Sequence, residues 1–320
     1  MRMNLQKMKM KAALFSAAVW TLAVGVFAAE RDAAAQARTA SIVVTVTAKR
    51  MLDIDTGTLM EQPLIEIQDG IITAVGRRDG TSRPATIDLG DVTLLPGLID
   101  CHTHLIGSES DTPYQSLIET PARAAIEGVA NAYATLRAGF TTVRDLGSRD
   151  LADVALRDAI AKGRILGPRM VVAVRSLSAT GGHGDKNDLP PDIAVHRYSG
   201  IADGPLEIQK KVRENVKLGA DWIKILATGG VTSRGTDPQQ TEYSEDEIRA
   251  AVLTASSRGR DVAAHAHGTA GIVAALRAGV RSVEHATYLS DEAIALFKQK
   301  GAFLVPNPYT NYYILEAGEK

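Results

Sequence analysis

The sequence contains two pairs of histidines whose members stand two positions apart. His102 and His104 follow the apolar run LLPGLIDC, and His265 and His267 follow DVAA. Side chains at positions i and i+2 of a β-strand point the same way, so each pair can face one site. Imidazole is the commonest protein ligand for zinc and similar metals. The spacing therefore predicts a metal site to which two strands contribute.

The remaining histidines divide into two groups. His285 lies at the end of the predicted strand in SVEHAT, and His183 lies in the glycine-rich segment SATGGHGD, which follows another predicted strand. Six of the seven histidines are therefore expected at one rim of the fold. His196 lies in a long irregular stretch, and we expect it to be a structural histidine.

Lys224 stands in an otherwise apolar predicted strand, within GADWIKILATGG. If Ile223 and Ile225 pack against outer helices, alternation turns Lys224 toward the interior. A buried ammonium group is costly without a partner, and more so beside cations. Two interpretations stay open. The lysine reaches the rim or pairs with a carboxylate, or carbon dioxide converts it into a carbamate, an anionic ligand able to bridge two metals.

These residues require a scaffold of alternating strands and helices, which the sequence predicts from residue 94 onward. The predicted strands are LLPGLIDC, FTTVRDL, RMVVAVR, WIKILAT, DVAAHAH, RSVEHA and AFLVP. The segments between them show apolar residues at helical spacing, mostly end in glycine, and include a capping box at Ser244 and Glu247. Such α/β alternation favours a (β/α)8-type TIM barrel, whose reactive side chains lie at the carboxyl ends of the strands. The tail YTNYYILE predicts a loop or a disordered end.

Composition and the N-terminus set the domain organisation. A hydrophobic content of 45% supports a full core, and a net charge of −1 without charged blocks gives no indication of nucleic-acid binding. Residues 1–37 have the basic, apolar and small-residue order of a signal peptide, so we expect an exported, periplasmic or secreted protein. An uncleaved membrane anchor is the alternative. Residues 38–93 predict a small N-terminal β-sandwich portion, and residues 94–320 predict the barrel.

The ordered segments LPGLIDCHTH, ADWIKILATGGV, VAAHAHG and SVEHA resemble the amidohydrolase superfamily. The resemblance is to the branch of imidazolonepropionase-like amidohydrolases, Xaa-Pro and Xaa-Arg/Lys dipeptidases and ochratoxin-type amide hydrolases. It implies two divalent metal ions, with zinc as the first expectation, and an N6-carboxylysine. The metal ligands that it implies are His102, His104, Lys224, His265 and His285, and the substrate-binding residues are His183 and His267. Alternation alone does not separate His265 from His267.

The resemblance implies a metal-dependent hydrolase that cleaves an amide or peptide bond next to a C-terminal amino acid. Two metals would activate a bridging hydroxide, and the two nonligand histidines suit a small-molecule or dipeptide substrate with a free carboxylate. Arg144 and Arg175 either contact that carboxylate or have structural roles. Two alternatives stay open: a hydrolase of cyclic amides or lactones with a single metal, and an inactive metal-binding fragment.

One feature of the superfamily is missing from the predicted barrel. Members of the superfamily carry an aspartate at the end of strand eight that binds metal and moves the proton. The last aspartate of this sequence is Asp291, at the start of the helix predicted after strand six. We therefore expect a barrel truncated after strand 7 that lacks its catalytic residue. Its exposed strand edges would favour pairing into a homo-oligomer.

Overall fold

The structure, a computed structural model, describes residues 42–79, 84–107, 119–189 and 200–318. The chain divides into two compact units, which meet in sequence between Pro96 and Gly97. The proposed signal peptide and His196 lie outside the described residues. Among the described helices, none has the length and apolar character needed to cross a membrane.

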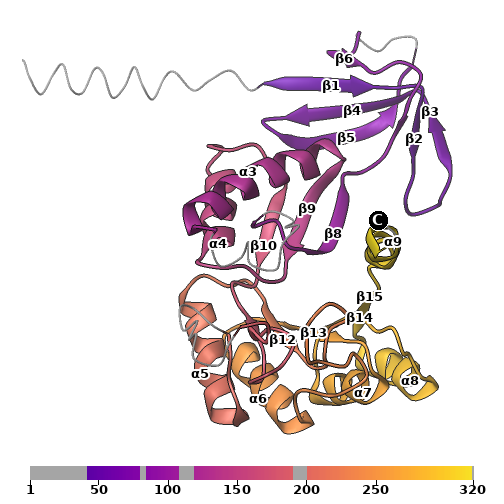
Figure 1. Cartoon of the computed structure of the whole chain (residues 1–320). Coiled ribbons are helices and arrows are strands. Elements are labelled where there is room, and N and C mark those ends of the chain that lie inside the picture. Colours follow the sequence, from indigo (N-terminus) through magenta and orange to yellow (C-terminus); the bar gives the residue numbers. More distant parts are fainter. Residues whose placement is uncertain (1–41, 80–83, 108–118, 190–199, 319–320) are drawn as a thin grey trace, which may run out of the picture. The chain divides into compact units, whose positions relative to one another are not determined.

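The N-terminal unit consists of short strands in two sheets (Figure 1). The first sheet has the order β5-β4-β1-β6, with strands β5 (Ile71–Arg77), β4 (Pro63–Gln68), β1 (Val43–Thr47) and β6 (Ile87–Asp88). The second has the order β3-β2-β7, with strands β3 (Leu59–Glu61), β2 (Arg50–Leu52) and β7 (Thr93–Leu94). Asp69 and Gly70 both have positive φ, so they form the tight turn that joins β4 to β5. The packing of these sheets as a sandwich stays a prediction.

The C-terminal unit alternates parallel strands with helices. Its first sheet contains β8 (Leu98–Thr103), β9 (Phe140–Asp145) and β10 (Arg169–Val172). Its second sheet contains β11 (Ser176–Leu177), β12 (Ile223–Leu226), β13 (Val262–Ala266), β14 (Ser282–His285) and β15 (Phe303–Val305), paired in that order. The helices are α3 (Pro121–Arg137), α4 (Ala152–Ala161), α5 (Gly204–Lys217), α6 (Glu245–Ser256), α7 (Thr269–Ala278), α8 (Asp291–Lys300) and α9 (Pro308–Gly318).

The third predicted strand is interrupted, and the interruption divides the sheet. The segment RMVVAVR was expected to be continuous, but Val174 has a φ of 68°, a conformation that a β-branched residue rarely adopts. Asp153 Oδ2 accepts the Val174 N–H at 3.0 Å, which holds the backbone in this conformation. The two sheets remain joined here, because the Val172 carbonyl accepts the N–H groups of Asp221 and Trp222 at 2.8 and 3.2 Å.

The main core is a cluster of buried side chains contributed by the second sheet and its helices. Figure 1 shows helices α5 to α8 beside this sheet. Ile223 and Ile225 of β12 are fully buried in one cluster with Ile208 of α5 and Ile248 of α6. Because these two isoleucines face the helices, alternation turns Lys224 to the opposite face of the sheet. The sequence-based expectation for the direction of Lys224 is confirmed.

Two local predictions had different outcomes. The capping box at Ser244 and Glu247 is present at the start of α6, with both reciprocal hydrogen bonds formed. The expectation of a loop or disordered end for YTNYYILE is wrong, because these residues belong to helix α9. Pro308 occupies the first position of α9, where its fixed φ favours a helix start.

Candidate metal centre

The six histidines expected at the rim lie in one cluster of the C-terminal unit. Ring centroids of neighbouring members lie between 4.4 Å and 5.3 Å apart. The His102 ring lies 5.3 Å from that of His104 and 5.1 Å from that of His285. The cluster therefore connects β8 with β14 across the interior of the unit. Its members are His102, His104, His183, His265, His267 and His285.

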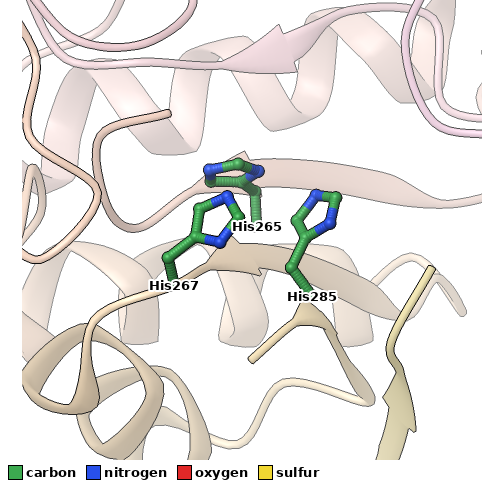
Figure 2. Close-up of side chains that lie close together, drawn as sticks. All are labelled: His265, His267 and His285. Atoms are coloured by element: carbon green, nitrogen blue, oxygen red, sulfur yellow. The ribbon is translucent and has the colours of Figure 1, made fainter. Parts of the chain in front are cut away.

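Three histidines at the ends of β13 and β14 could hold a cation directly. Figure 2 shows the rings of His265, His267 and His285 gathered at the ends of these neighbouring strands. One ring nitrogen from each lies within 4.8 Å of the others. His267 therefore lies beside the two predicted ligands His265 and His285. Its assignment to the substrate and not to the metal stays a prediction.

The backbone at the end of β14 is strained at His285, whose ring belongs to the cluster. His285 and Ala286 have φ angles of 70° and 47°, in the left-handed region. Non-glycine residues adopt this region at a cost, and such residues concentrate at functional sites. The stacked His267 ring, 4.7 Å away with an interplanar angle of 14°, holds the His285 ring from one side.

Lys224 lies inside the histidine cluster. It is 2% exposed, and its Nζ is 3.4 Å from Nε2 of His102. Among the described residues, no carboxylate oxygen lies within 4.0 Å of this Nζ. Burial lowers the pKa of Lys224 to about 8, although the negative charge of Glu284 acts in the opposite direction. The lysine therefore carries a buried amine that lacks a directly paired carboxylate in the part of the chain that the structure describes.

A buried ion pair supports His102, and the sequence analysis missed it. Glu284 is fully buried and accepts hydrogen bonds on Oε1 from Arg144 Nη2 at 2.9 Å and from Ser282 Oγ at 2.6 Å. Its Oε2 lies 3.1 Å from His102 Nδ1. The available signal was a glutamate inside the predicted strand RSVEHA, because charged side chains are rarely buried unless they are paired.

The guanidinium of Arg144 makes three contacts with other residues of the C-terminal unit. Besides Glu284, it donates from Nε to the Cys101 carbonyl at 2.7 Å, and its guanidinium lies 4.4 Å from the centre of the Trp222 ring. These contacts support the structural interpretation of Arg144 over a contact with substrate. Arg175 is buried, and its carbonyl accepts a hydrogen bond from Asn215 Nδ2 at 2.8 Å. A contact of Arg175 with a substrate carboxylate stays a prediction.

His104 and His183 lie at the two sides of the cluster. His104 is exposed, and its Nδ1 lies 2.9 Å from the Gly147 carbonyl. The backbone N–H of His183 donates to Glu242 Oε1 at 2.6 Å, and its Nδ1 lies 2.5 Å from Ser233 Oγ. Burial raises the pKa of Glu242 to about 7. The backbone and one ring nitrogen of His183 are thus fixed by two contacts from other segments.

The electrostatics of the cluster favour neutral imidazoles. Burial, followed by nearby positive charge, lowers the pKa of His183 to about 4 and that of His285 to about 3. Burial also lowers the pKa of His265 well below its ordinary value. Neutral imidazole is the form that binds metal ions. The number, proximity and charge state of these rings therefore fit divalent cations.

Comparisons with known proteins agree with this chemistry. Residues 93–317 match the Amidohydrolase family. Ochratoxinase from Aspergillus niger is 36% identical over 228 residues, which cover 66% of this chain and 47% of the ochratoxinase. Imidazolonepropionase from Photobacterium profundum is 24% identical over 86% of this chain and 71% of its own length. The chain thus spans about half the length of the curated ochratoxinases that it matches.

The chain is also similar to solved structures of a dipeptidase and of ochratoxinase. A Xaa-Pro dipeptidase with methionine bound in its active site superposes with a TM-score of 0.78 and 33% identity, over 87% of this chain and 70% of that chain. The structure of A. niger ochratoxinase superposes with a TM-score of 0.76 and 32% identity, over 87% of this chain and 68% of that chain.

Proposed function

Because the chain belongs to the amidohydrolase family, we propose that it hydrolyses an amide or peptide bond next to a C-terminal amino acid. The observation that carries the proposal is the single cluster of six imidazoles around the buried Lys224. The likeness to a Xaa-Pro dipeptidase and to ochratoxinase supports a substrate that is a dipeptide or a small amide.

The proposed metal-holding residues lie in or directly after four strands, and they are four histidines of the cluster and the lysine beside them. They are His102, His104, Lys224, His265 and His285. Two divalent cations bound by these residues, with zinc as the first expectation, would supply Lewis acidity and a water of lowered pKa. The protein itself contributes neutral imidazoles that are already close together, so little rearrangement is needed to bind the cations.

Lys224 is proposed to be carboxylated. Its neutral amine would attack the carbon of carbon dioxide, so that an N–C bond forms, one C–O π bond moves to oxygen as a negative charge, and the amine releases a proton. The product is a carbamate anion, which replaces a buried positive charge among cations with a negative one. The burial of Lys224 without a paired carboxylate in the described residues supports this proposal.

His183 and His267 are proposed to bind the substrate carboxylate. A neutral imidazole donates from one ring nitrogen only, so each can donate to the carboxylate from Nε2 in the tautomer in which the hydroxyl beside its Nδ1 donates to that nitrogen. His267 Nδ1 lies 2.8 Å from Thr287 Oγ1, and His183 Nδ1 lies 2.5 Å from Ser233 Oγ, so both rings are held by neighbouring hydroxyls. We propose no residue of this chain for the transfer of the proton.

The scaffold is proposed to be part of a (β/α)8-type TIM barrel. The sequential parallel order of the strands supports this, as does the contact between side chains of β8 and β14 across the interior. In such barrels the carboxyl ends of the strands carry the reactive groups, and the histidines of β8, β13 and β14 lie at those ends.

Elemental analysis combined with a hydrolysis assay tests the proposal. We expect two zinc ions per chain, turnover of members of a library of dipeptides and N-acyl amino acids, and loss of turnover on chelation that added zinc reverses. Lys224→Met should lose metal, whereas the matched control Lys217→Met, at an exposed position of α5, should not. One metal ion per chain together with turnover of cyclic amides would contradict the proposal.

Export of the protein is a separate proposal. It is supported by the order of basic, apolar and small residues in positions 1–37. Cell fractionation of the full chain tests it. We expect the protein outside the cytoplasm and shortened at its N-terminus, and an intact chain in the cytoplasm would contradict export.

A further inference from the structure

The geometry points to Glu284 as a positioning residue that sets which nitrogen of His102 faces the metal centre. Glu284 Oε2 lies 3.1 Å from His102 Nδ1, and His102 Nε2 lies 3.4 Å from Lys224 Nζ. The two ring nitrogens of His102 therefore have different partners. A carboxylate accepts hydrogen bonds only, so Nδ1 must carry the proton and Nε2 must present its lone pair.

Glu284 is itself held so that its Oε2 cannot turn away from His102. Its Oε1 accepts from both Arg144 Nη2 and Ser282 Oγ, and the side chain is fully buried. A carboxylate fixed at one oxygen by two donors presents the other oxygen in a single direction. Because that direction is toward His102, the ring orientation of His102 is fixed before any cation binds.

Arg144 also positions the backbone next to His102. The guanidinium that binds Glu284 also donates from Nε to the carbonyl of Cys101, the residue directly before His102. It further lies over the ring of Trp222, which precedes β12. One buried cation therefore fixes both the strand position of His102 and the acceptor for its ring.

These contacts exceed what a purely structural ion pair needs. Pairing with Arg144 already compensates the charge of Glu284, yet its second oxygen is directed to His102. Glu284 also directly precedes His285 in β14, so one strand supplies a proposed ligand and the support of another. Partners of this kind orient metal-binding histidines, and their loss typically weakens metal binding about 10–100-fold.

The first experiment measures the tautomer of His102 in the metal-free full chain. Protein labelled with ¹⁵N at histidine is examined by long-range ¹H–¹⁵N correlation, and His102→Gln identifies the His102 signals by their disappearance. We expect the proton on Nδ1. A proton on Nε2 would overturn the inference, whether or not the protein binds metal.

The second experiment compares Glu284→Gln with Asp153→Asn, since each replaces a fully buried carboxylate by the amide of the same shape. In Glu284→Gln the new amide oxygen would face Arg144, which leaves the amide N–H₂ against His102 Nδ1 and forces the proton to Nε2. We expect that switch, and a zinc dissociation constant about 10–100-fold higher, for Glu284→Gln alone. An equal loss of zinc affinity in both variants, or an unchanged tautomer in Glu284→Gln, would overturn the inference.

The tautomer of His102 tests the role of Glu284 directly, whereas the zinc dissociation constant also depends on the proposed metal centre. The two measurements can therefore fail separately. A wild-type chain with the Nδ1 proton that switches in Glu284→Gln, yet binds no zinc, supports Glu284 as the positioning residue and contradicts the proposed metal centre. Ser282→Ala provides a milder variant. It removes one hydrogen bond to Oε1 and leaves the contact of Oε2 with His102, so the Nδ1 proton should remain.

Discussion

Replacing Arg144 by methionine should destabilise the C-terminal unit, because Glu284 then remains buried without its cation. The Arg144 Nη2 and Glu284 Oε1 atoms are 2.9 Å apart, and the two residues are 9% and 0% exposed. Breaking such a pair from one side costs about 3–5 kcal/mol. Ser282 and His102 still contact the carboxylate, so we expect the lower half of this range. At about 2–4 °C per kcal/mol, the melting temperature should fall by roughly 6–16 °C.

Thermal unfolding followed by circular dichroism, and urea unfolding followed by fluorescence of Trp222, measure this loss. The matched test is the double variant Arg144→Met/Glu284→Gln, in which the unpaired charge is also removed. It should recover at least half of the lost stability, because its remaining deficit is the missing hydrogen bonds, about 1 kcal/mol each. A fall of less than about 2 °C in Arg144→Met, or strictly additive effects in the double variant, would refute the reasoning.

Three further predictions concern the support of His183, two buried carboxylates and bound cations. A Cβ at Gly230 would overlap His183 Nδ1, so Gly230→Ala should displace the ring and raise the KM for dipeptides about tenfold. Its zinc content, measured by elemental analysis, should be unchanged, and lost zinc would contradict the assignment. Burial raises the pKa of Asp145 and Asp153 to about 7, so each contributes stability that is full below about pH 4 and is lost as the pH rises to about 7. The stability of Asp153→Asn relative to the wild type should therefore rise as the pH increases from about 4 to about 7. A difference between their urea midpoints that does not change with pH would refute this. Chelation should lower the stability of the wild type by about 2.7 kcal/mol for each of the two zinc sites, if zinc was present at 100 times the dissociation constant of that site. Lys224→Met should melt at the same temperature with and without chelator.

The direction of Lys224 was predictable because it depends on a local rule. Ile223 and Ile225 are apolar neighbours in a period-2 pattern, and they do pack against the helices. The spacing of His102 and His104 also carried over, since both lie in the histidine cluster. His267 also lies in the cluster, although it follows the last residue of β13 just as His104 follows the last residue of β8.

The parts that could not be predicted depend on contacts between distant segments. Val174 reads as a strand residue in RMVVAVR, but Asp153 from α4 holds it at positive φ. Propensity favours the strand there, and a tertiary hydrogen bond overrides it. Glu284 was likewise missed as a functional candidate, because its partners His102 and Arg144 lie 182 and 140 positions away.

The sequence by itself determined the alternation of strands and helices from β8 to β15 apart from the break at Val174, the capping of α6 and the group of side chains at the rim, because periodicity and spacing act over a few residues. Only the tertiary structure decided which carboxylate compensates which cation and which nitrogen of His102 faces Lys224. Those choices depend on distances of about 3 Å between groups from separate strands, and the strength of hydrogen bonds and ion pairs changes steeply over that range.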